Sequence, residues 1–337
     1  YELNRANTRE KARNAVSKIH SPGLNVVWAN TAGDIGWWAG GKLPQRPEGV
    51  NPMFILDAAK GEAEKPGFYA FNFNPQEENP ARGYIVSANH QPQPASGVPV
   101  PGYYNLPDRA RRIDDVIKDP KRKWNIAGAQ ELQLDVSNGY STRILKELLP
   151  VLEQVVTDPN EKAFLEPLQK WDGFYTRDSV AATLFSQLMY ELAKATFEDE
   201  LGEVQFKNLL RTRALDLGLP VLVADTKSPW WDNVNTPQSE SRFETARIAW
   251  AATYKHLSGL YGSTLLDWRW GNAHTLTHGH PLGMQKPLDK LFNVGPFQVP
   301  GGRETPNNYS GSVGPAPWKV KYGPSTRRVI DFAAPDK

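Results

Sequence analysis

Three histidines, His274, His278 and His280, lie within the short segment HTLTHGH. Imidazole is the commonest metal ligand, and strand residues separated by an even number of positions share one face, so a metal site here is geometrically allowed. A polar strand face followed by a Gly-His-Pro turn accounts for the same residues. We favour that interpretation, because no carboxylate nearby would complete or orient a metal site. The sequence therefore predicts no metal site.

Asn89 is a candidate for a different chemistry, because it follows a segment, Tyr84 to Ala88, in which the sequence predicts a strand. A carboxamide just past a strand end can point out of a sheet as a fixed hydrogen-bond donor. An ordinary turn asparagine is the alternative, and the local sequence by itself favours that alternative. The neighbouring motifs decide between the two.

Two pairs of tryptophans suggest a third kind of site, an aromatic platform that binds a ligand. The pairs are Trp37-Trp38 and Trp230-Trp231. Neighbouring residues on a strand point to opposite faces, which favours one ring in the core and the other under a covering loop. An aromatic-rich ligand-binding module is kept as an alternative function.

Composition argues against several classes of function. The 39 Lys and Arg residues nearly balance 37 Asp and Glu residues, so there is no excess positive charge for nucleic acid. The absence of cysteine excludes disulfides, thiolate metal sites and cysteine nucleophiles, and it is compatible with the periplasmic or secreted location that we expect. No apolar run approaches the roughly 18 residues that span a bilayer, so we expect no membrane partner. No nucleotide, lipase-type or zinc-protease motif occurs, and no cofactor is predicted.

The elements that would hold these residues fall into three parts of an α+β chain. Residues 1–106 are β-rich, with a helix at 6–19 and a hairpin that turns at Thr31 to Asp34. Residues 107–260 are mainly helical. Helices are expected at DRARRIDDVIKD, from Ile126 to Val156, in NEKAFLEPLQKW, at 178–197, and from Thr236-Pro237 to His256. In residues 261–337 strands and loops return.

Several blocks, read in order, resemble the penicillin acylase (penicillin amidase) family of N-terminal nucleophile hydrolases. They extend from about Leu24 to Asp331, so the resemblance covers most of the chain. The blocks are LNVVWANTAGDIGWWAGGKLPQR, NPARGYIVSANHQP, LPDRARRID, LQLDVSNGYSTRILKELLP, WDG, WRWGNAHTLTHGHPLG and VPGGRETPNN. Each motif is moderately specific by itself, and the ordered set is much more specific.

The resemblance implies a fold, a reaction and a substrate class. The fold would be an αββα sandwich, two antiparallel sheets covered by helices, of which this chain supplies a part together with a helical subdomain. The reaction would be hydrolysis of an acyl amide, by acylation and deacylation of a serine. The substrate would be a β-lactam with an acyl side chain or an acyl-homoserine lactone.

The nucleophile of the family is the first residue of its β subunit, a serine whose own α-amino group acts as general base. An α-amine titrates at about pH 7.7 to 8, so it is partly unprotonated at neutral pH. This chain begins with Tyr1, and a phenol cannot take that role. We expect the chain to be the C-terminal part of a β subunit, with the α subunit and the N-terminal part of the β subunit as partners. A non-catalytic fragment or subunit that completes a partner's fold is the alternative.

Two positions match functional residues of the family. Asn89 corresponds to the asparagine whose amide stabilises the tetrahedral oxyanion, and Arg109, in PDRARRID, corresponds to the arginine that helps to hold the polar network of the site and the substrate. A purely structural role is the alternative for Arg109. Loss of one oxyanion donor typically costs about 2.7 to 4 kcal/mol of transition-state stabilisation. The family also holds calcium through an aspartate shortly after the asparagine. Here QPQPASG places Gly97 near that position, so calcium is not predicted.

Overall fold

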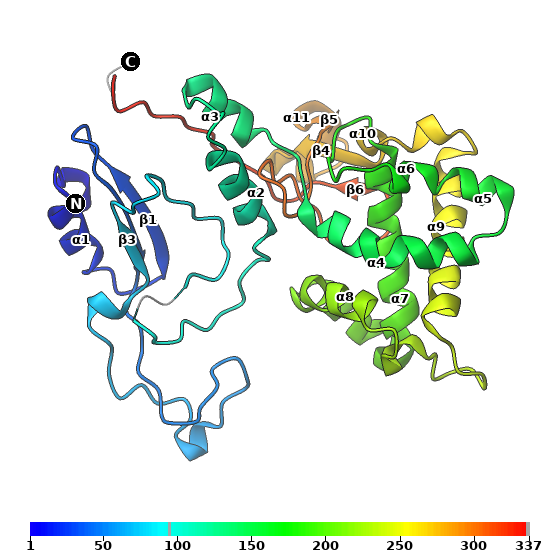
Figure 1. Ribbon diagram of the computed structural model, residues 1–337, viewed down its shortest axis with the longest axis horizontal. Coiled ribbons are helices and arrows are strands. Elements are labelled where there is room, and N and C mark those ends of the chain that lie inside the picture. The colour runs from blue at the N-terminus through cyan, green and yellow to red at the C-terminus, as the bar shows by residue number, and fades with distance from the viewer. Residues whose placement is uncertain (94–95, 335–337) are drawn as a thin grey trace. The chain divides into compact units, whose positions relative to one another are not determined.

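The computed structural model describes residues 1–93 and 96–334 and has a mixed α+β fold (Figure 1). The chain divides into two compact units. Unit 1 comprises Tyr1–Ala110 and Arg328–Lys337, and unit 2 comprises Arg111–Arg327. The three-part division at residues 106 and 260 stays a prediction, and its last three residues, 335–337, lie outside the described residues.

Unit 1 contains a small antiparallel sheet with one helix packed against it. Its elements are η1 (Leu3–Arg5), α1 (Arg9–Val16), β1 (Leu24–Ala29), β2 (Ile35–Gly40), η2 (Ala58–Lys60), η3 (Phe71–Phe73) and β3 (Gln76–Glu78). The strand order is β1-β2-β3. The predicted helix and hairpin are both confirmed. Between the hairpin strands, Asn30 Oδ1 accepts the backbone N–H groups of Ala32 at 3.1 Å and Asp34 at 2.9 Å, which closes the turn.

The core of unit 1 lies between α1 and β2. Trp38 is fully buried against Ala12 and Val16 of the helix. Thr8 caps helix α1, since its side chain accepts the N–H of Lys11, and Ala12, Ala15 and Val16 form the buried face of the helix. Trp38 is therefore the largest fully buried side chain of this core.

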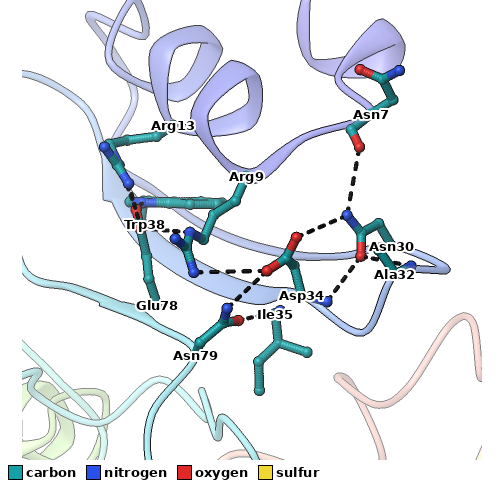
Figure 2. A network of polar contacts seen from close by, with 10 residues as sticks. All are labelled: Asn7, Arg9, Arg13, Asn30, Ala32, Asp34, Ile35, Trp38, Glu78 and Asn79. Carbon is teal, nitrogen blue, oxygen red and sulfur yellow. Dashed lines mark hydrogen bonds and ion pairs between the residues drawn. The ribbon is translucent and has the colours of Figure 1, made fainter.

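A network of charged and polar groups joins α1 to the sheet (Figure 2). Glu78 accepts a hydrogen bond from Trp38 Nε1 at 2.8 Å and pairs with Arg9 at 3.1 Å and with Arg13. Asp34 accepts from Asn79 at 2.8 Å, which ties the hairpin turn to the end of β3. The helix and the third strand are thus fixed to the hairpin by directional contacts rather than by a large core.

Most of the described residues between 41 and 107 are irregular, and one prediction is wrong here. No strand forms at Tyr84 to Ala88 in the described structure, because no neighbouring segment supplies a ladder of backbone hydrogen bonds. A single isolated parallel bridge instead joins His90 to Asn105. Asn89 therefore lies between two irregular segments rather than at the end of a sheet strand.

Helices make up most of unit 2, with α2 (Asp108–Ile117) leading into it. The others are α3 (Ile126–Gln133), α4 (Gly139–Val155), α5 (Pro159–Ala163), α6 (Glu166–Gln169), α7 (Val180–Leu209), α8 (Ala214–Ala224), η4 (Pro229–Trp231), α9 (Arg242–Tyr261), η5 (Leu265–Trp268), α10 (Trp270–Ala273), η6 (Pro281–Met284) and α11 (Asp289–Phe292). Their largest fully buried side chains come mainly from α4, α7 and α9.

Three helix predictions need correction. The long helix expected from Ile126 to Val156 is two helices, because Asn138 caps α4 by accepting the N–H of Tyr140. The helix expected from Thr236 begins instead at α9, where Ser241 and Glu244 form a capping box. The helix expected in NEKAFLEPLQKW is two short helices, α5 and α6. Helix α8, with the sequence ALDLGLPVLVA, was not predicted.

The sheet of unit 2 has the strand order β5-β4-β6. Its strands are β4 (His274–His278), β5 (Val294–Gln298) and β6 (Trp318–Lys319), and β4 is antiparallel to β5 and parallel to β6. Across the described ranges of the chain, no helix is both long enough and apolar enough to cross a membrane.

Candidate functional site

Asn89 adopts a left-handed backbone conformation with φ at 60°. Asparagine tolerates this conformation better than most residues, because its short polar side chain bonds locally. The backbone is held on both sides: Ala88 is buried, and the N–H of Asn105 donates to the carbonyl of Asn89 at 3.0 Å. The side chain itself is exposed. The local structure therefore presents a carboxamide to solvent from a backbone that is fixed in place.

Arg109 lies in the first turn of α2, and its Nη2 donates a hydrogen bond to Oδ1 of Asn89. The structure thus brings together the two predicted site residues, which are 20 positions apart in the sequence. A guanidinium group has donors only, so it must bond the oxygen of the carboxamide. The Nδ2 end of Asn89 is consequently oriented away from Arg109 as a donor. Leu106 and Ala110, on either side of Arg109, are buried and anchor this turn.

His90 is a third residue of this site, and the sequence analysis did not single it out. Burial and the charge of Arg109 both lower the pKa of His90, so its ring is neutral at pH 7. Its Nδ1 is buried and has no protein hydrogen-bond partner. The only sequence signal was its position next to Asn89. A neutral ring there adds no second positive charge beside the guanidinium of Arg109.

The three histidines of HTLTHGH do not face one another as a ligand set would. His274 is buried, its Nδ1 lies 3.0 Å from the carbonyl of Val299, and its ring stacks on Trp270. His278 and His280 are exposed, and His280 accepts the N–H of Leu282 at the start of η6. Over residues 1–93 and 96–334, no three His, Cys, Asp or Glu side chains are grouped so as to hold a metal.

The segment QPQPASG is only partly visible, because Pro94 and Ala95 lie outside the described residues. Gly97, near the position where the family resemblance places a calcium-binding aspartate, has φ at 76°. It contributes no side-chain oxygen as a ligand. The prediction that calcium is not held here stays a prediction.

The paired tryptophans each place one ring inside the protein. Trp38 and Trp231 are fully buried, whereas Trp37 is partly exposed and Trp230 is 40% exposed. Trp37 and Trp38 alternate on β2 as expected for a strand, but Trp230 and Trp231 belong to the 3-10 helix η4. The buried indoles donate to Glu78 and to the carbonyl of Asp225, as core residues do. These contacts favour core packing over a ligand platform.

Comparison with known proteins finds relatives that match most of the chain. The acyl-homoserine lactone acylase QuiP of Pseudomonas syringae pv. tomato is 27% identical over 353 residues, which cover 99% of this chain and 42% of that protein. QuiP of Pseudomonas aeruginosa is 26% identical, over 82% of this chain and 34% of that protein. The chain thus spans less than half the length of these curated relatives.

A solved structure shares the fold of much of this chain. The thermostable penicillin G acylase from Alcaligenes faecalis matches with a TM-score of 0.62 and 20% sequence identity, over 79% of this chain and 52% of that chain. The Penicillin amidase family itself matches residues 1–337. Because that match extends along the whole sequence, the chain belongs to the penicillin amidase family.

Proposed function

We propose that this chain is the part of an N-terminal nucleophile amide hydrolase that supplies an oxyanion donor, the side-chain amide of Asn89. The hydrogen bond from Arg109 to Oδ1 of Asn89 is the observation that carries the proposal. It orients Nδ2 as a donor, and the positive charge of Arg109 polarises the amide toward a developing anion. A donor that is fixed in advance costs no reorganisation when the charge forms.

The reaction has two steps, and Asn89 serves both. The hydroxyl nucleophile gives its proton to the α-amine of its own residue and attacks the acyl carbonyl, whose oxygen becomes an oxyanion that Nδ2 of Asn89 stabilises. The C–N bond then breaks as the α-amine passes that proton to the leaving nitrogen, and the amine departs. Water then attacks the resulting ester through a second oxyanion at the same place. The acid is released and the hydroxyl is restored. Arg109 acts as a positioning residue, because it touches Asn89 rather than the reacting carbonyl.

We place the nucleophile, an N-terminal serine, on a segment of the acylase outside these 337 residues. The QuiP relatives support this placement, because the matched region is 42% of the length of QuiP from P. syringae pv. tomato. The αββα sandwich would be completed by the same segment, and a periplasmic or secreted location accords with the absence of cysteine.

The substrate that we propose is an acyl-homoserine lactone, whose amide joins an acyl chain to a lactone amine. The activity for which the QuiP relatives are named supports this choice, and their similarity extends over 99% of this chain. An acyl β-lactam is the second candidate. It is favoured by the fold shared with penicillin G acylase.

Substitution of Asn89 in the complete acylase tests the proposal. We expect Asn89→Asp to lower kcat for an acyl-homoserine lactone by about a hundredfold to a thousandfold, because a carboxylate has no hydrogen to donate. Aspartate keeps an acceptor for Arg109 and tolerates the left-handed backbone. Circular dichroism and the melting temperature should therefore match the unsubstituted enzyme.

Asn89→Gly is the matched control for backbone strain. Glycine adopts a φ of 60° without cost and has no side-chain amide, so kcat should fall as far as it does in Asn89→Asp. A loss of less than about threefold in both variants would rule out the oxyanion role. That result would favour the alternative in which this chain only completes the fold of a catalytic partner.

A further inference from the structure

His90 is the one titratable side chain in residues 88–93, and the proposed reaction does not use it. Its backbone pairs with Asn105 in the isolated parallel bridge. Because the N–H of Asn105 also donates to the carbonyl of Asn89 at 3.0 Å, positions 89 and 90 are fixed to the segment that leads into α2. The imidazole of His90 is therefore attached to the same backbone as the candidate donor.

The hydrogen bond between Arg109 and Asn89 completes a closed set of contacts. Asn105 lies just before α2 and holds the backbone of Asn89, and Nη2 of Arg109, in the first turn of α2, donates to Oδ1 of the same asparagine. Both contacts end at Asn89. Displacement of the guanidinium, or of the backbone at residues 89 and 90, would therefore release the carboxamide.

The surroundings of His90 favour an uncharged imidazole. Its Nδ1 is buried, and within residues 1–93 and 96–334 it has no hydrogen-bond partner. Burial and the positive charge of Arg109 both lower the pKa of His90 from 6.5. A proton on this imidazole would add a second cation beside Arg109 in a buried place, where like charges repel more strongly than in water.

The other ionisable groups near this pair do not offset that repulsion. They are Tyr103, Tyr104 and Asp108, on the segment that leads into α2. Tyrosine side chains carry no charge well below pH 10, and burial raises the pKa of Tyr104 further. Asp108 is buried, and its charge is not among the causes that shift the pKa of His90. Arg109 is thus the charged group that a protonated His90 would meet.

We propose that His90 is a positioning residue of the oxyanion donor: its uncharged imidazole allows Arg109 to stay against Asn89, and a proton on it drives Arg109 away. This inference rests on the proposed function. The repulsion is relieved when the guanidinium or the imidazole moves, and either movement releases Oδ1 of Asn89. The carboxamide can then rotate and present its oxygen, which repels a developing oxyanion, in place of Nδ2. The site thus loses its donor as the pH falls.

His90→Gln in the complete acylase tests the proposal, because glutamine is polar and takes up no proton in this range. The measured quantity is kcat at pH 5 divided by kcat at pH 8 for one acyl-homoserine lactone. Protonation of the α-amine of the nucleophile lowers this ratio in all variants alike. We expect the ratio to be at least about threefold higher in His90→Gln than in the unsubstituted enzyme, whatever the kcat of the variant at pH 8.

Two comparisons separate the positioning role from a structural one. His278→Gln is the matched control, because it removes an exposed histidine of unit 2 by the same substitution, and its ratio should equal that of the unsubstituted enzyme. Arg109→Gln removes the charge that a protonated His90 repels, so in that background His90→Gln should change the ratio by less than about 1.5-fold. An unchanged ratio in His90→Gln would overturn the proposal, and so would a full effect in the absence of Arg109.

The protonation of His90 can also be followed without any hydrolysis. Exchange of the C2 hydrogen of each histidine, measured by mass spectrometry over a range of pH, reports the pKa of that imidazole in a large protein. In the complete acylase we expect a pKa below 6.5 for His90, and a value nearer 6.5 in Arg109→Gln. A pKa at or above 6.5 in the unsubstituted enzyme would contradict the proposal.

Asn89→Asp, measured in the same assay, distinguishes this inference from the proposed function. If kcat falls in Asn89→Asp and the pH ratio does not respond to His90→Gln, only the positioning role is wrong. If kcat does not respond to Asn89→Asp, the oxyanion role is wrong, and the inference that rests on it is wrong as well.

Discussion

Each of the two units of the chain is stabilised by a different kind of internal contact. Among the largest fully buried side chains in the described parts of the sequence, Trp38 is in unit 1, and the other eleven are in unit 2: Trp231, Trp250, Trp268, Phe206, Ile144, Leu148, Leu152, Leu168, Leu184, Leu188 and Leu192. Unit 1 relies instead on the polar network around Glu78 and Asp34 (Figure 2). Its stability therefore depends on a few directional contacts.

The candidate site belongs to the unit with the smaller core. Asn89 lies in an irregular segment with a left-handed backbone, and irregular segments carry function because they can present side chains that regular elements would point elsewhere. Unit 2 is mainly helical and has the larger core, and the candidate site residues Asn89 and Arg109 do not belong to it. Unit 1 should thus be the easier unit to unfold, and substitutions in both units test this contrast.

The largest expected effect is a tryptophan truncation in each unit. Trp38→Ala and Trp250→Ala should each cost about 3 to 5 kcal/mol, because both indoles are almost fully buried. In unit 1 this loss removes the centre of the core, so the amides of β1 and β2 should exchange as in an unfolded chain. In unit 2 the neighbouring helices should remain protected. Hydrogen exchange with mass spectrometry measures both, and equal protection loss in the two variants would contradict the contrast.

The polar network of unit 1 can be weakened without changing its shape. Glu78→Gln should destabilise unit 1 by about 1.5 to 3 kcal/mol, because Arg9 and Arg13 lose an ionised partner. Burial opposes ionisation of Glu78, but the hydrogen bonds from Arg13 and Trp38 and the charges of Arg13 and Arg9 outweigh it, so its pKa is lowered from 4.5. This stabilisation is present above pH 4.5 and is lost as the pH falls below it. In urea unfolding, the free energy of unfolding should change less between pH 7 and pH 3.5 in Glu78→Gln than in the unsubstituted protein.

Unit 2 should respond to pH in a different range, through His274. Burial lowers the pKa of His274 from 6.5 to about 4, although hydrogen bonds to Val299 and Tyr309 oppose the shift. Between those values the unfolded chain binds a proton that the folded chain does not, so stability is full above pH 6.5 and decreases toward pH 4. We expect a loss of about 1 to 2 kcal/mol between pH 7 and pH 5. His274→Gln should remove this slope, and an unchanged slope would show that another group is responsible.

Two glycine substitutions give the smallest effects, with opposite signs. At Gly36 a Cβ would lie 2.4 Å from the ring of Trp38, so Gly36→Ala should destabilise unit 1 by about 1 to 2 kcal/mol. Gly259 lies in α9, and apart from its chain neighbours and the nearby backbone of the helix no atom lies within 4 Å of the position that a Cβ would take. Gly259→Ala should therefore stabilise unit 2 by about 0.5 to 1 kcal/mol. The melting temperature of each variant checks these predictions. An increase in the melting temperature of Gly36→Ala would contradict the packing described for Trp38.

Elements with a local cause were predictable from the sequence. The hairpin of β1 and β2 has a Gly-Asp turn, and α1 has a threonine cap, so neighbouring residues determine both. The strand predicted at Tyr84 to Ala88 does not form, because a strand needs a second strand to hydrogen-bond with, and that second strand can come from a segment far away in the sequence. The predicted start of α9 was wrong for a simpler reason. Ser241 and Glu244 form a capping box that the sequence contains, but the prediction used the Thr236-Pro237 start signal instead.

The amino-acid sequence by itself determined the family, the absence of thiol chemistry, and the identity of Asn89 and Arg109 as candidate site residues. Only the tertiary structure decided how those two residues meet. It brings Arg109 to Oδ1 of Asn89 and shows the left-handed backbone that presents the carboxamide. The physical reason is that residue types define which atoms can donate or accept, whereas their orientation depends on contacts between segments distant in the chain.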